Sequence, residues 1–133
     1  MKIIHLIKKH LPDTQAIYLF GSYGTDDETS KSDVDIALLL PYAAAKKQGA
    51  FYVMELHSGL ESDLHRNVDL VNLRQVDVVF QKEVIMANRR IDCSDAYAAD
   101  EFEMLTLSYY QQLNRERAEI IEEAIKVGQV YKP

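Results

Sequence analysis

Three aspartates stand in or beside apolar runs that predict β-strands. Asp33 and Asp35 lie two residues apart at the start of the run 34–40, and Asp69 lies inside the run 68–73. Side chains at i and i+2 of a strand share a face, which puts Asp33 and Asp35 about 7 Å apart at Cβ. Like charges so placed repel unless a cation neutralises them, and Mg²⁺ is the usual cation with phosphate substrates. The pair predicts a metal site; a solvent-exposed strand end is the alternative.

A glycine-serine pair follows the first predicted strand. The β-prone run 16–20 stops at Gly21, and Ser22 opens a polar loop. Glycine lets the backbone turn sharply and lets a ligand approach closely. A helical turn beginning at Ser22 would point free backbone N–H groups outward, and helix N-termini of this kind bind phosphate. We expect a phosphate-binding turn here; an ordinary turn or cap is the alternative.

The three features together predict phosphoryl chemistry. A carboxylate at Asp69 is costly among apolar neighbours unless it is paired or metal-bound. If its strand lies beside the run 34–40, Asp69 joins Asp33 and Asp35. Three carboxylates around nucleotide phosphates form the two-metal arrangement, in which one ion activates the attacking oxygen and the other stabilises the leaving group.

Alternating strands and helices must position these residues. Apolar residues at helical spacing predict a short amphipathic helix over 3–11, and Tyr52, Leu56 and Leu60 form one stripe of a helix over 44–65. Asp77 is a candidate N-cap for a helix over 78–88. The alternation implies a sheet covered by helices. Its expected strands are 16–20, 34–40, 68–73 and 91–93.

The C-terminal third predicts a long helix. Residues 95–126 contain neither proline nor glycine, although 106–110 could interrupt the helix. We favour packing of its apolar stripe on the sheet, with a partner surface as the alternative. The stripe consists of Leu105, Tyr109, Leu113, Ile120, Ile121 and Ile125.

Length and composition bound the class of protein. A chain of 133 residues with 47% hydrophobic residues predicts a single domain over 1–133, with a core over about 1–93 and a helical segment over about 95–127. The one cysteine excludes an intrachain disulfide. No apolar run reaches the length of a membrane span, and the start of the chain does not resemble a signal peptide, so we expect a cytoplasmic protein with no membrane contact.

Charge argues against nucleic-acid binding. The net charge is −6, and no basic cluster is visible in the sequence. Residues 95–133 carry 4 basic and 8 acidic groups, which suits a basic protein partner better than a nucleic acid.

The motif at residues 21–35 resembles a known family. Gly21-Ser22, ten residues and then Asp33-Val34-Asp35 match the G-S-x10-D-x-D motif of the DNA polymerase β-like nucleotidyltransferase superfamily. Its small stand-alone branch is the minimal nucleotidyltransferase (MNT) family, whose third acid the Asp69 strand resembles. The resemblance implies a nucleotidyltransferase fold of the α/β (α+β) class, a small mixed β-sheet flanked by helices with a long C-terminal helix.

The resemblance also implies roles for the motif residues. Asp33 and Asp35 would bind both Mg²⁺ ions and the phosphates of ATP. Asp69 would be a ligand of one ion and would help deprotonate the acceptor hydroxyl. Gly21 and Ser22 would hold the triphosphate. The implied reaction transfers a nucleoside monophosphate from a nucleoside triphosphate to a hydroxyl and releases pyrophosphate.

The loop departs from the family pattern in its charge. Many MNT proteins have a basic residue after Gly-Ser, where this chain has Tyr23, and residues 26–28 are all acidic. Lys31 is the loop's only cation. Arginines elsewhere could supply charge, although surface roles are the alternative for each: Arg66, Arg74, Arg89 and Arg90.

The family resemblance also implies a partner. Stand-alone MNT proteins are often encoded beside HEPN-domain RNases, as the antitoxin of a HEPN/MNT toxin–antitoxin pair. They are understood to AMPylate a toxin tyrosine near an R-x4-6-H motif, using ATP and Mg²⁺. We therefore expect a protein adenylyltransferase that silences a cognate HEPN toxin. Two alternatives stay open: a nucleotidyltransferase for an antibiotic-like small molecule, and a non-catalytic antitoxin that inhibits by binding.

Overall fold

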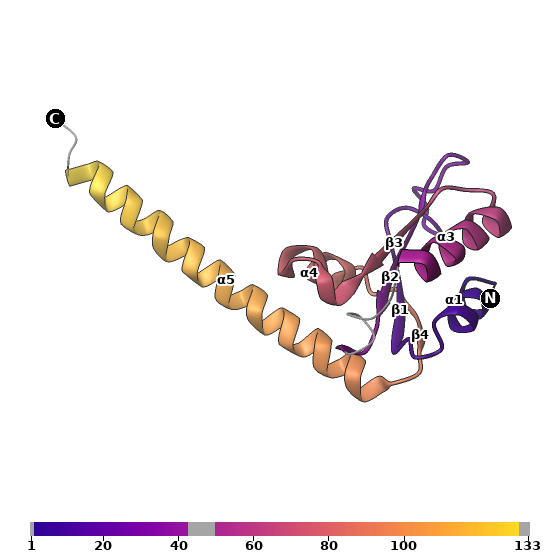
Figure 1. Ribbon diagram of the computed structural model, residues 1–133. Helices are drawn as coiled ribbons and strands as arrows, with labels where there is room; N and C mark the ends of the chain where they lie inside the picture. The colour runs from indigo at the N-terminus through magenta and orange to yellow at the C-terminus, as the bar shows by residue number, and fades with distance from the viewer. Residues whose placement is uncertain (1, 43–49, 131–133) are drawn as a thin grey trace.

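The computed structural model describes residues 2–42 and 50–130 of the chain, with side chains for all of these except 50–53 and 128–130. The described residues up to 93 form both helices and strands, and one long helix follows them (Figure 1). The elements are α1 (Lys2–His10), β1 (Ala16–Phe20), β2 (Val34–Leu39), α3 (Ala50–Leu64), β3 (Val68–Asn72), the 3-10 turn η1 (Leu73–Gln75), α4 (Val78–Met86), β4 (Arg90–Cys93) and α5 (Ala96–Val130).

The four predicted strands form one mixed sheet in the order β3-β2-β1-β4. β1 runs antiparallel to both β2 and β4, whereas β2 and β3 are parallel. The register places Asp35 opposite Phe20 of β1 on one side and opposite Asp69 of β3 on the other. The prediction that the two acidic strands are neighbours is therefore confirmed.

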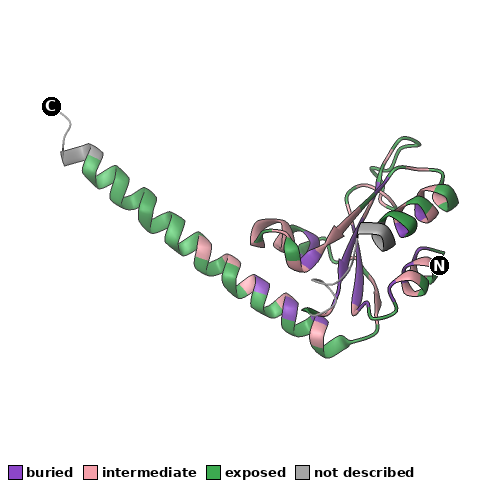
Figure 2. Ribbon diagram, viewed as in Figure 1, coloured by how far each residue is buried: buried purple, intermediate pink, exposed green. Residues whose placement is uncertain are grey.

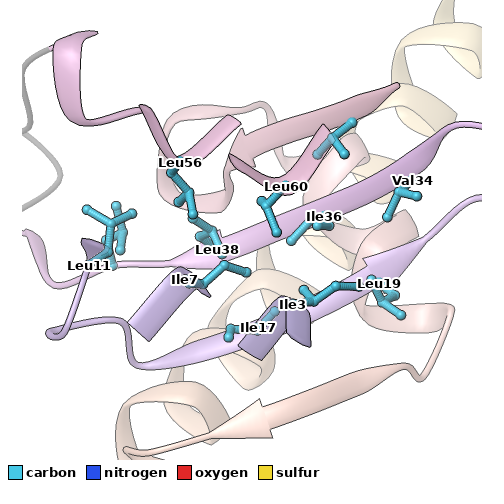
Figure 3. Close-up of a cluster of buried hydrophobic side chains, with 12 residues drawn as sticks. Ile3, Ile7, Leu11, Ile17, Leu19, Val34, Ile36, Leu38, Leu56 and Leu60 are labelled. Carbon is cyan, nitrogen blue, oxygen red and sulfur yellow. The ribbon is translucent and has the colours of Figure 1, made fainter. Parts of the chain in front are cut away.

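The helices α1 and α3 cover one face of the sheet. Even-numbered apolar residues of β2 contact this layer, and Figure 3 shows their side chains converging with those of the helices. The labelled members of this cluster are Ile3, Ile7 and Leu11, the strand residues Ile17, Leu19, Val34, Ile36 and Leu38, and Leu56 and Leu60. Leu56 and Leu60, two members of the expected stripe, are both buried. The expected start of this helix at 44–49 and the Tyr52 side chain lie outside the described residues.

The opposite face of the sheet is covered by α4 and the first turns of α5. Ala37 and Leu39 of β2 pack there with Val84 of α4 and Phe102 of α5. Because β2 is buried on both faces, it reads as a continuous apolar run rather than as an alternation. Asp35 shares its face with Ala37, so the acidic end of β2 opens on the side of α4.

The long helix α5 corrects one expectation and confirms another. It runs without interruption from Ala96 to Val130, so 106–110 does not break it. At about 1.5 Å per residue its 35 residues span about 50 Å, whereas a five-residue strand spans about 17 Å. The helix therefore extends past the sheet, and every residue from 114 to 127 is exposed (Figures 1 and 2).

The predicted packing of the α5 stripe on the sheet is wrong for most of its members. Leu105 and Tyr109 are 40% and 59% exposed, and Leu113 is partly buried. Ile120, Ile121 and Ile125 are 67%, 60% and 56% exposed. The buried positions lie in the first turns instead, at Ala99, Phe102 and Thr106. The alternative, a surface for a partner, is the one that this geometry favours. The division into a core over 1–93 and a helical segment over 95–127 stays a prediction.

Two smaller features complete the fold. Asp77 caps α4 as predicted, because its carboxylate accepts a hydrogen bond of 2.8 Å from the backbone N–H of Phe80. The predicted strand at 68–73 ends at Asn72, where η1 begins. Among the helices that the structure describes, none is long and apolar enough to cross a membrane.

Candidate active site

The sheet brings the three predicted aspartates to one edge. Asp35 and Asp69 occupy the same position on adjacent parallel strands, whose backbones are about 4.8 Å apart. Asp33 lies two residues before Asp35, immediately ahead of β2. Asp33 and Asp69 are exposed and Asp35 is partly buried, so all three carboxylates are accessible to a ligand at this edge.

The electrostatics of this edge favour an added cation. Burial raises the pKa of Asp35 above its ordinary value, and the negative charges of Asp69 and then Asp33 raise it further. Within the described part of the chain, no lysine, arginine or histidine forms an ion pair with any of the three aspartates. The negative charge is therefore uncompensated by the protein itself, and binding a divalent cation would relieve the repulsion.

The aspartates suit Mg²⁺ rather than a metal held entirely by protein ligands. Over residues 2–42 and 50–130, no three acidic, histidine or cysteine side chains converge as a metal-ligand set. Mg²⁺ does not require one, because it usually binds through one or two carboxylates, substrate phosphates and water. The donor set fits an ion that arrives with a nucleoside triphosphate.

Gly21 leaves room for the Asp35 carboxylate. Its φ of +75° lies in the left-handed region that favours glycine. A Cβ built at this position would lie 2.1 Å from Oδ2 of Asp35, well inside van der Waals contact. The glycine of the motif is therefore required both by the turn that ends β1 and by the neighbouring carboxylate.

The loop after Gly21 corrects the predicted helical turn. Residues 22–33 form turns and bends, with no helix beginning at Ser22. Gly24, with a φ of +77°, turns the chain into the left-handed region again, which is incompatible with a right-handed helix. The Ser22 hydroxyl instead donates a hydrogen bond of 3.0 Å to Oγ of Ser32, across the base of the loop.

The backbone of the loop leaves hydrogen-bond donors available to a ligand. The N–H groups of Ser22, Tyr23 and Gly24 have no acceptor among the residues that the structure describes. Successive N–H groups in a turn form a concave anion-binding surface, which serves phosphate without a helix. These three N–H groups begin one residue after Gly21, which lies against the Asp35 carboxylate.

Two arginines that the sequence could not place hold the loop at its two ends. Arg89, just before β4, donates from Nη1 to the carbonyl oxygen of Gly21 (3.0 Å) and from Nη2 to that of Tyr23. Arg66, just before β3, donates to the carbonyl oxygens of Thr29 (3.2 Å) and Ser32 (3.4 Å). Arg66 also pairs with Oε1 of Glu28 at 3.0 Å and lies over the ring of Tyr23. The loop is thereby shaped by side chains from outside it.

The other candidate basic residues lie either away from the loop or next to the acidic edge. Arg74 donates to the carbonyl oxygen of Leu40 and to Gln15, and Arg90 pairs with Asp100 and Glu103, so both are engaged away from the loop. Lys31 is exposed and lines a cavity of about 540 Å³ beside Asp33, together with His65 and Arg66. This cavity places positive charge next to the acidic edge.

Comparison with known proteins agrees with the geometry. The family model described as "Polymerase beta, Nucleotidyltransferase" matches residues 1–97, which contain the whole sheet and the loop. The chain belongs to this nucleotidyltransferase family. The fold prediction is confirmed with it: a small mixed sheet flanked by helices and followed by a long C-terminal helix.

This nucleotidyltransferase has similar relatives of described activity. It is 37% identical over 125 residues to "Protein adenylyltransferase MntA" of Shewanella oneidensis, covering 93% of this chain and 86% of that protein. A chain in a crystal structure of a toxin–antitoxin with AMP-PNP is 36% identical, with a TM-score of 0.71 and coverage of 93% and 96%. A chain in the structure of the tri-AMPylated S. oneidensis HEPN toxin in complex with MNT antitoxin is also 36% identical, with a TM-score of 0.66 and coverage of 93% of each chain.

Proposed function

We propose that this nucleotidyltransferase is an antitoxin that transfers AMP from ATP to a tyrosine hydroxyl of a cognate HEPN RNase toxin. The observation that carries the proposal is the Asp33, Asp35 and Asp69 edge beside the Gly21 turn. The chain that bears it is 36% identical to a chain in the complex of an AMPylated HEPN toxin with its MNT antitoxin. We infer further that it acts in the cytoplasm, where ATP and the toxin's RNA targets are found, and that it does not itself bind nucleic acid.

The transfer is a displacement at the α-phosphorus of ATP. The acceptor oxygen forms a bond to the α-phosphorus, the bond from that phosphorus to the bridging oxygen of the β-phosphate breaks, and pyrophosphate leaves. Asp69, exposed at the edge, accepts the hydroxyl proton. The N–H groups of Ser22 and Tyr23 hold phosphate oxygens, and Lys31 offers positive charge to the leaving pyrophosphate.

The proposed metal ligands are the three aspartates. Asp33 and Asp35 would hold two Mg²⁺ ions, with Asp69 as a further ligand of one. When bound, Mg²⁺ supplies charge neutralisation for the phosphates and lowers the pKa of the attacking hydroxyl. The raised pKa of Asp35 supports this role, because its anion is poorly stabilised by the protein alone.

The experiment that tests this function uses ATP labelled at the α-phosphate, with Mg²⁺ and the purified cognate toxin. We expect label on the toxin with the wild-type chain and none with the Asp33→Asn/Asp35→Asn double variant. If the double variant still binds and inhibits the toxin without labelling it, the protein is a binding antitoxin. Label that appears only on a small molecule of the cell extract would replace the protein acceptor by a small-molecule one.

A further inference from the structure

An apolar hollow lies beside the glycine of the phosphate-binding turn. It has a volume of about 420 Å³ and lies between the end of β1 and the helix α4. Phe20 and Gly21 line it from the strand, and Phe80, Val84 and Met86 line it from the helix. This size falls within the range of small-molecule sites, about 300–1,000 Å³.

The lining of this hollow suits a flat aromatic group. The rings of Phe20 and Phe80 meet edge to face, with centroids 5.4 Å apart and planes at 83°. Met86 is 61% exposed at the mouth, although its apolar side chain would gain from being covered. Glu83 is the single charged residue that lines the hollow, and it is paired with Lys82 at 3.1 Å. The surface therefore offers stacking and dispersion contacts rather than charge.

The hollow is continuous with the candidate active site through one residue. Gly21 lines it and also lies against the Asp35 carboxylate, while the unpaired N–H groups of Ser22, Tyr23 and Gly24 follow directly. An apolar ring site, a carboxylate edge and an anion-binding turn thus lie side by side. A nucleotide presents the same succession of groups: a planar base, then a sugar, then metal-bound phosphates.

We propose that this hollow is the nucleobase subsite of the enzyme, in which the base of the nucleoside triphosphate stacks on Phe80 and Met86. The inference rests on the proposed function, because it takes a nucleotide as the substrate. The toxin's tyrosine ring is the competing occupant. A hollow of this size suits a small molecule better, because a tyrosine on a folded partner could enter it only together with the protein surface that surrounds that tyrosine.

The test measures equilibrium binding by calorimetry, in the presence of Mg²⁺, of two probes: ATP and inorganic tripolyphosphate, which lacks the base. Phe80→Leu keeps an apolar side chain but removes the ring, and Met86→Ser changes an exposed position. We expect the Kd for ATP to rise about 5- to 150-fold, the range for loss of a stacking contact, and the Kd for tripolyphosphate to stay unchanged. Met104→Ser, at a position 63% exposed on α5, is the matched control and should change neither.

The outcomes separate this subsite from the proposed function. Unchanged ATP binding in both variants overturns the subsite, as does an equal weakening for the two probes. An unchanged Kd for ATP with a raised KM for the toxin assigns the hollow to the acceptor ring instead. If Phe80→Leu fails to fold, Met86→Ser decides alone. A wild-type chain that binds ATP but transfers nothing contradicts the proposed function and leaves the binding test intact, whereas one that binds no ATP contradicts both.

Discussion

Replacing Gly21 with alanine tests the link between the turn and the Asp35 carboxylate, which we propose to be catalytic. The added methyl group would lie 2.1 Å from Oδ2 of Asp35, where ordinary contact begins at 3.4 Å, so the carboxylate must move by roughly 1 Å. The φ of +75° adds strain of about 1–2 kcal/mol for any residue with a Cβ. Turning the Asp35 side chain off its rotamer costs about 0.5–1.5 kcal/mol more.

Gly24→Ala provides a matched control for this variant. Gly24 has nearly the same φ, +77°, and so pays the same backbone strain of about 1–2 kcal/mol. Its Cβ would meet only Nη2 of Arg89, at 3.0 Å, which is the far end of a flexible side chain. The two variants therefore share a loss of stability but differ in whether they displace Asp35.

The assay compares rates of AMP transfer with thermal unfolding followed by circular dichroism. A misplacement of about 1 Å costs roughly 10²-fold in rate, so we expect Gly21→Ala to lower kcat about 100-fold. Gly24→Ala should lower kcat less than about threefold, equivalent to about 0.7 kcal/mol. Equal loss of activity in the two variants would refute the reasoning, because backbone strain alone would then explain both.

Three further predictions follow from the site and from α5. Asp35→Asn should raise the melting temperature at pH 7 in EDTA and abolish stabilisation by Mg²⁺; an unchanged melting temperature in EDTA would contradict this. In the wild-type chain the pKa of Asp35 is higher in the folded than in the unfolded state, so the ionised carboxylate lowers the free energy of unfolding at every pH above the folded pKa. This destabilisation is relieved as the pH falls through the folded pKa towards the unfolded pKa. Melting temperatures measured between pH 4 and 8 in EDTA, for the wild type and for Asp35→Asn, check the sign. Arg89→Ala should raise the KM for ATP about tenfold, roughly 1.4 kcal/mol, by releasing the carbonyl oxygens of Gly21 and Tyr23, and an unchanged KM would show that the loop keeps its shape without it. Deleting residues 115–133 should change the free energy of unfolding by less than about 0.5 kcal/mol, because residues 114–127 are exposed; a larger loss in a denaturant titration would mean that the outer helix supports the core.

The sequence predicted the strands and the acidic edge because those signals are local. β1 is an apolar run and β2 is apolar except for Asp35. The i, i+2 spacing places Asp33 and Asp35 on one face whatever the rest of the fold does. The pairing with Asp69 needed only that two neighbouring elements in the chain be neighbours in the sheet. That pairing joins residues far apart in the chain, so the sequence could state it only as a condition on the order of the strands.

The conformation of the loop 22–33 was not predicted correctly, because it depends on side chains from other elements and on local hydrogen bonds that compete with a helix. Its serine, threonine and aspartate side chains bond to nearby backbone and hydroxyl groups, which opposes a helix, and Gly24 turns the chain the other way. Arg66 and Arg89 reach it from 34 to 68 residues away in the chain. The order of the strands would have pointed to these two arginines, because they precede β3 and β4, which both begin at the edge of the sheet where the loop lies. No pattern in α5 indicates that Ala99, Phe102 and Thr106, rather than the apolar stripe, face the core.

The exposed outer half of α5 has a consequence for how it can be recognised. Its backbone hydrogen bonds have no tertiary packing over them between residues 114 and 127, and isolated helices of about 12–15 residues are only marginally stable in water. Amide hydrogens there should therefore exchange with solvent through local opening, long before those of the sheet. A partner that covers this segment must supply the free energy of ordering it, and part of the gross contact energy is spent on folding the helix. Affinity at this surface is then set by helix propensity as much as by contact area, so that alanine substitutions on its far side would tighten binding without touching the partner.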